Sequence, residues 1–332
     1  MIVLGIESSC DETAAAVYTP DGIRSNVIAS QTIHEKFGGI VPELASRAHH
    51  TRITPTVKQA LEEAGTDRDD VDLIAVTSGP GLMGSLLVGL CFAKGLSLAC
   101  RVPLVGVNHI DAHIYSNFID HEPRYPFVCL IVSGGHTRLV HVPRPFDHRV
   151  LGKTRDDAAG EAFDKIGKLL GLAYPAGPEI DRRSQNGDPD FHSFPRAMIR
   201  EGFEFSFSGL KTSLLYYVEE KGEDFVQNHL DDICASVSQA ITEVLSVKLR
   251  RAAEQTGVET VMLAGGVSAN SMLRIKAKSA ADVMGVELLI PRMEYCTDNA
   301  AMIAITGLMK MEEEAIGEEE LGLGVRPFAR MP

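Results

Sequence analysis

An apolar strand, a short polar loop and a returning strand occur twice in this chain, and this repeat limits the folds that the chain can adopt. The first copy spans residues 2–18 and the second spans residues 127–142. Unbroken apolar runs of this length predict buried strands. The loops at 8–13 and 133–137 are rich in hydroxyl side chains and glycine, whose donors suit phosphate. The repeat therefore predicts an internally repeated α/β organisation, with a plain tight turn as the alternative for each loop.

The first loop carries five functional side chains within six residues, reading Ser8-Ser9-Cys10-Asp11-Glu12-Thr13. Its hydroxyls and backbone N–H groups donate to phosphate, and its carboxylates can orient a cation or a water molecule. Serine and aspartate are also common turn residues, so an ordinary hairpin turn is the alternative. The density of functional groups favours a site.

A pair of glycines separates a predicted strand at 260–264 from a predicted helix at 271–284. Gly265 and Gly266 allow a flat ligand such as a purine nucleoside to lie against the backbone, and Asn270 can bond its hydroxyls or ring edge. The alternative is an ordinary loop in which Asn270 or Ser268 caps the helix. The classical Gly-x-Gly-x-x-Gly dinucleotide motif is missing from the sequence.

Two histidines four residues apart follow a predicted strand at 104–107. In a helix, His109 and His113 share one face, where two neutral imidazoles can hold one transition metal. Position 110 is isoleucine, so the glutamate that serves a zincin protease as general base is absent. Asp298 is the candidate third ligand, because it also lies where a strand gives way to a helix. The alternatives are two ordinary helix histidines and a capping aspartate.

Charge and composition favour a cytosolic globular protein. The 332 residues suffice for two domains, and the net charge of −13 argues against a protein that coats nucleic acid by charge alone. Six acids lie in 311–320, which we interpret as the solvated face of a C-terminal helix. The apolar run at 82–100 contains Lys94 and several glycines, which favours a buried helix over a membrane span. Without a basic signal-peptide region or a Cys-x-x-Cys pair, we expect a cytoplasmic chain with reduced thiols and no membrane partner.

The order of these elements is that of the actin/Hsp70/sugar-kinase (ASKHA) fold, in which two α/β lobes hold a nucleotide in the cleft between them. We expect residues 1–107 with about 300–332 to form the N-terminal lobe, and residues 108–299 the C-terminal lobe. An ATPase or small-molecule kinase of this fold is one alternative, but it would leave His109 and His113 idle. A metalloprotease lacks its glutamate, and a purely structural role leaves the polar strand ends unexplained.

Seven motifs, spread in order over essentially the whole chain, are similar to those of the bacterial tRNA N6-adenosine threonylcarbamoyltransferases, the TsaD family. They are GIESSCDET at 5–13, PELASRAH at 42–49, NHIDAH at 108–113, VSGGHT at 132–137, GEAFDK at 160–165, AGGVSAN at 264–270 and CTDN at 296–299. The Ser-Cys-Asp-Glu-Thr form resembles bacterial or organellar members. The metal positions show no departure from the family pattern.

This resemblance implies a set of functional residues. It implies one metal ion per chain, usually described as iron, with Zn²⁺ as the alternative, on His109, His113 and Asp298. The phosphate and threonylcarbamoyl end of the substrate would contact Val132, Ser133, Gly134, Gly135 and His136. The nucleotide would be held by Asp164, Gly177, Asp181 and Asn270, with the two aspartates on ribose hydroxyls. Asp11 and Glu12 are the candidates for orienting the acceptor or relaying its proton.

The resemblance also implies the reaction and its partners. The substrate would be threonylcarbamoyl-AMP, supplied by another enzyme. The acceptor would be the N6 amine of adenosine 37 in tRNAs that read codons beginning with A. Family members of this type work with a paralogous, non-catalytic subunit of the TsaB type and a small ATPase of the TsaE type.

Overall fold

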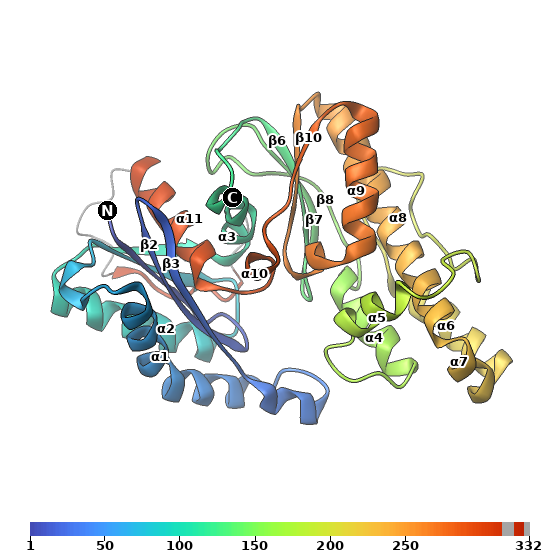
Figure 1. Cartoon of the computed structure of the whole chain (residues 1–332), viewed down its shortest axis with the longest axis horizontal. Helices are drawn as coiled ribbons and strands as arrows, with labels where there is room; N and C mark the ends of the chain where they lie inside the picture. Colours follow the sequence, from blue (N-terminus) through green and yellow to red (C-terminus); the bar gives the residue numbers. More distant parts are fainter. Residues whose placement is uncertain (314–321, 329–332) are drawn as a thin grey trace. The chain divides into compact units, whose positions relative to one another are not determined.

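The computed structural model describes residues 1–313 and 322–328, and the chain divides into two compact units (Figure 1). The first unit comprises Met1–Pro123 and Pro291–Pro332, and the second comprises Arg124–Ile290. Each unit contains one five-stranded sheet of mixed direction with helices against it. This arrangement confirms the predicted two-lobed α/β fold. The acidic run at 311–320 lies largely outside the described residues.

The sheet of the first unit has the strand order β3-β2-β1-β4-β5. Its first three strands form an antiparallel meander, and β1, β4 and β5 run parallel, so their carboxyl ends meet at one edge. The strands are β1 (Val3–Glu7), β2 (Glu12–Thr19), β3 (Gly22–Ser30), β4 (Leu73–Gly79) and β5 (Leu104–Asn108).

Helices cover both faces of this first sheet because alternate residues of β1 point in opposite directions. Leu4 and Ile6 belong to the apolar cluster shared with α1 and α2. On the other face Gly5 touches α11 so closely that a Cβ atom would lie 2.3 Å from the carbonyl oxygen of Ala300. The helices of this unit are α1 (Pro42–Ala64), α2 (Met83–Cys100), α3 (His109–Tyr115), α10 (Met293–Cys296) and α11 (Ala300–Glu313), with the 3₁₀ turns η1 (Thr32–Phe37), η2 (Arg68–Asp70) and η3 (Ser116–Ile119).

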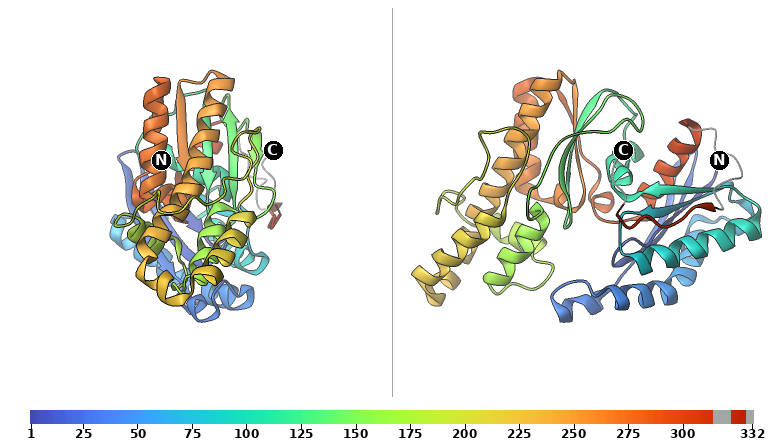
Figure 2. Two further views of the ribbon diagram at one scale, coloured as in Figure 1. Left: turned by 90° about the vertical axis from the view of Figure 1, so that its right-hand side faces the viewer. Right: turned by 180° about the vertical axis from the view of Figure 1, so that it is seen from behind.

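The sheet of the second unit has the order β10-β9-β6-β7-β8, with β6 and β7 forming the second predicted hairpin. Because β6 and β9 are parallel neighbours, the loops that follow them lie side by side. The long helix α8 spans much of this unit (Figure 2). The strands are β6 (Phe127–Val132), β7 (Thr137–Val142), β8 (Arg149–Lys153), β9 (Thr260–Ala264) and β10 (Glu287–Leu289). The helices are α4 (Ala159–Leu169), α5 (Gly177–Ser184), α6 (Ser208–Lys221), α7 (Glu223–Asn228), α8 (Leu230–Thr256) and α9 (Ser271–Met284), with the 3₁₀ turn η4 (Gly266–Ala269).

The boundaries between the units differ from the expected ones. The sequence predicts that 108–123 and 291–299 belong to the second lobe, but both segments lie in the first unit. The physical reason is packing, because α3 lies against α11 and the side chain of Tyr295 is buried in the cluster that contains Ala14 and Ala16. All three candidate metal ligands therefore belong to one unit.

Helix α2 is long and apolar enough to cross a membrane, judged by length and composition alone. One third of it, 33%, is buried in the described part of the chain, where it packs against α1 and β4. The core helix of a soluble protein meets the same criteria, so α2 alone does not indicate a membrane span.

Candidate metal centre and nucleotide-binding residues

The two histidines are placed by the junction between β5 and α3. Asn108 ends the strand, and its side-chain oxygen accepts the backbone N–H groups of Ile110 at 2.9 Å and Asp111 at 3.3 Å. This N-cap starts the helix at His109, so His113 follows one turn later on the same face. Both imidazoles are buried, with only 8% of His109 and 1% of His113 exposed.

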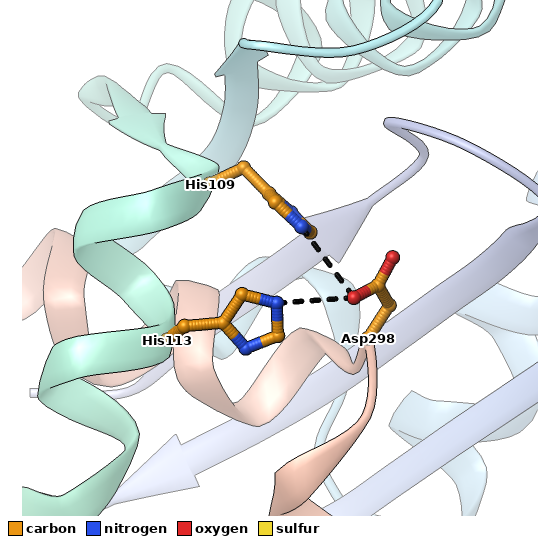
Figure 3. A group of neighbouring side chains, drawn as sticks. All are labelled: His109, His113 and Asp298. Carbon is orange, nitrogen blue, oxygen red and sulfur yellow. Dashed lines mark hydrogen bonds and ion pairs between the residues drawn. The ribbon is translucent and has the colours of Figure 1, made fainter. Parts of the chain in front are cut away.

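Asp298 completes the group from the start of α11. The carboxylate oxygen Oδ1 lies 3.1 Å from Nε2 of His113 and 3.4 Å from Nε2 of His109 (Figure 3). One ligand atom from each of the three residues lies within 4.8 Å of the others. The capping role that Asp298 could have had belongs to Asn299, whose side-chain oxygen accepts the N–H of Met302 at 2.9 Å. The structure therefore brings the three predicted ligands together.

Glu7 is a neighbour of this group that the sequence analysis did not single out. Its Oε2 lies 3.1 Å from Nδ1 of His109, the ring nitrogen that faces away from Asp298. The side chain of Glu7 is fully buried, and it also accepts the backbone N–H of Ser9 at 2.5 Å and the hydroxyl of Thr77 at 2.6 Å. The available signal was a carboxylate at the end of an otherwise apolar strand, because a buried charge requires partners.

The donor set fits a cation. A neutral imidazole has one N–H, and the Nδ1–H of His109 can serve Glu7, which leaves the lone pair of Nε2 directed at an oxygen of Asp298. Such a contact is stable only if the ring carries a second proton or if a cation lies between the two atoms. A metal about 2.1 Å from each ligand separates those ligands by about 3.0–3.4 Å, and the contacts of 3.1 and 3.4 Å match this spacing.

The electrostatics of the centre agree with this interpretation. Burial opposes charge on His109, but Asp298 and Glu7 raise the pKa of this imidazole well above its ordinary value. Burial also opposes ionisation of Asp298, yet the two histidines lower the pKa of this carboxyl well below its usual range. Burial, Asp298 and Asp11 raise the pKa of Glu12 to about 10. The site therefore concentrates negative charge that a bound cation would relieve.

The predicted acidic pair follows β1 in the same unit, on a loop that His49 holds in place. Nε2 of His49 lies 3.0 Å from the carbonyl oxygen of Cys10, and Nδ1 lies 2.8 Å from the hydroxyl of Thr13. A carbonyl only accepts, so Nε2 carries the proton and Nδ1 accepts from Thr13. His49 thus ties helix α1 to both ends of the segment that carries Asp11 and Glu12.

The second predicted loop forms a compact turn after β6. The N–H of Ser133 donates to the carbonyl of His136 at 2.8 Å, and the N–H of His136 donates to the hydroxyl of Ser133 at 3.1 Å. Helix α4 begins against this turn, where a Cβ atom on Gly160 would lie 2.6 Å from the carbonyl oxygen of Ser133. Gly265, with φ of +84°, lies against Val132, so the loops after β6 and β9 meet.

The two remaining predicted aspartates, Asp164 and Asp181, each accept hydrogen bonds at the start of a helix of the second unit. Oδ1 of Asp164 accepts the N–H of Ala176 at 2.8 Å, and the carboxyl group also accepts the N–H of Gly177, where α5 begins. Oδ1 of Asp181 accepts the N–H of Ser271 at 3.0 Å and its hydroxyl at 2.8 Å. Asp164 therefore lies beside Gly177, and Asp181 lies beside the helix start that follows Asn270.

The capping interpretation of Asn270 is correct. Its side-chain oxygen accepts the N–H of Leu273 at 2.9 Å and so caps α9. This bond uses the oxygen and leaves the amide nitrogen as a donor for a ligand. The two interpretations of Asn270 therefore concern different atoms of the same side chain.

Comparisons with known proteins point to one family. The family model described as TsaD, tRNA N6-adenosine threonylcarbamoyltransferase, matches residues 22–305. The tRNA N6-adenosine threonylcarbamoyltransferase of Salinibacter ruber is 56% identical over 94% of this chain and 95% of the relative. The enzyme of the same description from Prosthecochloris aestuarii is 51% identical over 99% of both.

Among solved structures, the ROK hexokinase of Thermus thermophilus superimposes with a TM-score of 0.52 at 15% identity. The superposition covers 95% of this chain and 100% of the hexokinase chain. At this identity the likeness shows the fold alone. It identifies the architecture as that of the actin/Hsp70/sugar-kinase class, as the sequence predicts.

Proposed function

Because the chain belongs to the TsaD family of tRNA N6-adenosine threonylcarbamoyltransferases, we propose that His109, His113 and Asp298 hold the metal ion of the threonylcarbamoyl transfer. The enzyme forms N6-threonylcarbamoyladenosine in tRNA, with threonylcarbamoyl-AMP as donor and AMP as leaving group. The observation that carries the proposal is the convergence of three ligand atoms at the carboxyl end of β5. Mixed nitrogen and oxygen ligands suit Fe²⁺ or Zn²⁺ better than Mg²⁺, and we propose one Fe²⁺ per chain.

The second unit provides the proposed site for the nucleotide of the donor. The carboxylates of Asp164 and Asp181 are proposed to accept ribose hydroxyls with their remaining lone pairs, since Oδ1 of each already accepts one backbone N–H group. The amide nitrogen of Asn270 is proposed to donate to the nucleoside. The turn after β6 and the start of α5 would complete the site with Val132, Ser133, Gly134, Gly135, His136 and Gly177.

The reaction requires the protein mainly to orient the two substrates and to stabilise the negative charge that develops. The donor is a mixed anhydride, so the acceptor amine attacks its carbonyl and negative charge develops on the carbonyl oxygen and the departing phosphate. A bound metal supplies positive charge for such atoms, and the N–H groups of Gly134 and Gly135 are proposed to donate to them. Asp11 and Glu12 are proposed to orient the amine or to relay its proton.

We propose that the enzyme works in the cytoplasm with two protein partners. The acceptor is tRNA, as the family implies, and the adenosine modified is position 37 of tRNAs that read codons beginning with A. The proposed partners are a paralogous non-catalytic subunit of the TsaB type and a small ATPase of the TsaE type.

Elemental analysis tests the metal assignment. Protein purified without chelators should contain close to one metal ion per chain, and the double variant His109→Ala/His113→Ala should contain almost none. His50→Ala, which changes an exposed histidine on α1, is the matched control and should keep its metal. Equal metal content in the double variant and in the control would refute the assignment.

A further inference from the structure

Glu7 offers a carboxylate to the ring nitrogen of His109 that a metal would not use. We propose that Glu7 is a positioning residue, which fixes the tautomer and the orientation of His109 so that Nε2 presents its lone pair to the metal. This inference rests on the proposed metal site and adds a residue for which the sequence analysis assigned no role.

The contacts of Glu7 are those of an ionised acceptor. The backbone N–H of Ser9 donates to Oε1, and the hydroxyl of Thr77 donates to Oε2, where Nδ1 of His109 also lies at 3.1 Å. All three neighbours carry hydrogens that a carboxylate accepts, and a carboxylate has enough lone pairs for them. The nearby hydroxyl of Ser9, 3.2 Å from Nδ1, can accept or donate and adapts to this arrangement.

This bonding pattern selects one form of the imidazole. A carboxylate held rigidly by Ser9 and Thr77 favours the tautomer of His109 with its proton on Nδ1. The same bond sets the rotation of the ring, because Glu7 lies at the end of a buried strand and cannot move aside. Carboxylate, histidine and metal then form a chain in which the outer carboxylate raises the basicity of the ligand.

The two histidines differ in this respect. Nδ1 of His113 is buried and makes no hydrogen bond within the described part of the chain. The orientation of His113 is therefore set by packing and by Asp298, whereas His109 has a dedicated partner. Loss of Glu7 should for this reason act on His109 and leave the ring of His113 unchanged.

Metal affinity provides the first test, with Zn²⁺ as the probe and a competing chromophoric chelator as the readout. Glu7→Gln keeps the size of the side chain but allows either tautomer of His109. We expect a 10- to 100-fold weaker affinity, the usual effect of losing such a partner. Asp72→Asn is the matched control. The carboxylate of Asp72 also accepts a backbone N–H group, that of Ile2 at 2.7 Å, but Ile2 lies at the opposite end of β1 from Glu7. The control should bind Zn²⁺ as the wild type does.

The tautomer itself is the second readout, and a merely structural role would not change it. Long-range ¹H–¹⁵N spectra of the metal-free protein, at a pH high enough to leave the imidazole of His109 neutral, should show His109 with its proton on Nδ1 in the wild type. In Glu7→Gln the metal-free protein should show a mixture of tautomers at His109 and unchanged signals at His113. Thermal unfolding in the presence of a chelator reports any general loss of stability separately.

The outcomes separate the two proposals. If the wild type binds Zn²⁺ and His109→Ala abolishes binding, but Glu7→Gln binds equally well with the same tautomer, the role of Glu7 is refuted while the metal site stands. If His109→Ala binds Zn²⁺ as tightly as the wild type, the metal site fails and the role of Glu7 fails with it. Weakened binding with a mixed tautomer supports both.

Discussion

Asn299 caps helix α11 through its side-chain oxygen, and this leaves its neighbour Asp298 free to face His109 and His113. Two adjacent residues with similar side chains thus have different roles, since Asn299 caps the helix and Asp298 contacts the histidines. The first prediction follows from this division, because either residue could have capped the helix on sequence grounds.

Asn299→Ala should destabilise the protein without emptying the metal site. Loss of the cap costs about 1 kcal/mol of unfolding free energy, and Asn299→Ser, which can still cap, should recover this part. The hydrogen bonds from the amide nitrogen of Asn299 to the carbonyls of Tyr295 and Thr297 are lost in both variants. Asp298→Ala should instead lose the metal, because it removes a ligand. Urea unfolding and elemental analysis of the three variants check this, and equal metal loss in Asn299→Ala and Asp298→Ala would contradict the division of tasks.

His49→Ala should slow turnover while leaving donor affinity unchanged. The imidazole holds Cys10 and Thr13, so its loss frees the loop that carries Asp11 and Glu12. We expect about a tenfold lower kcat, which corresponds to about 1.4 kcal/mol of misplaced catalytic groups. The neighbouring His50→Ala, on the exposed side of α1, is the control. Steady-state kinetics decide the matter, and indistinguishable kcat values for the two variants would show that the loop needs no such support.

Asn270→Asp should separate helix capping from nucleotide binding. Aspartate keeps an oxygen for the N–H of Leu273, so α9 and the stability of the protein should be preserved. It removes the amide donor, so AMP binding should weaken by about 1–3 kcal/mol, the usual cost of an unpaired polar partner. Calorimetry with AMP measures this, with Asn270→Ala as the variant that should lose both properties. An unchanged affinity of Asn270→Asp for AMP would show that the nucleoside does not accept a hydrogen bond from this amide.

His148 should make the protein less stable in mild acid. Burial lowers the pKa of His148 to about 4, below the ordinary value near 6.5 of an unfolded histidine. Between these two values the unfolded chain binds a proton that the folded chain does not, so unfolding free energy falls as pH decreases from about 6.5 to about 4. The loss should approach about 2–3 kcal/mol over this range. Urea unfolding at several pH values should show a weaker pH dependence in His148→Gln, and an identical dependence in both proteins would contradict the assignment.

Much of the fold could be predicted from the sequence because its signals are local. Apolar runs ended by polar loops mark β1 and β6, and a glycine marks the end of α1, where Gly65 has the left-handed conformation with φ of 63°. The histidines could be found because helical spacing of four residues puts them on one face. Their common site with Asp298 followed from the rule that ligands gather at the carboxyl ends of parallel strands.

The remaining features depend on contacts between distant parts of the chain. Glu7 contacts Thr77 and His109 only because β1, β4 and β5 are neighbours in the sheet. The order of strands in a sheet cannot be read from the local periodicity of the sequence. The division into units differs from the expected lobes for the same reason, since the packing of α3 against α11 joins segments far apart in sequence. Likewise Asp164 bonds to the N–H of Ala176, which lies 12 residues further along the chain, beyond the reach of a helical spacing pattern.

The centre formed by His109, His113 and Asp298 is proposed to serve threonylcarbamoyl transfer to tRNA. The most direct test supplies purified threonylcarbamoyl-AMP, unmodified tRNA and the partner subunits, and measures N6-threonylcarbamoyladenosine in digested tRNA by mass spectrometry. The wild type should form the modified nucleoside and release AMP in equal amounts, and His113→Ala should lose most of this activity. Full activity of His113→Ala, or no modified nucleoside from the wild type with all partners present, would contradict the claim.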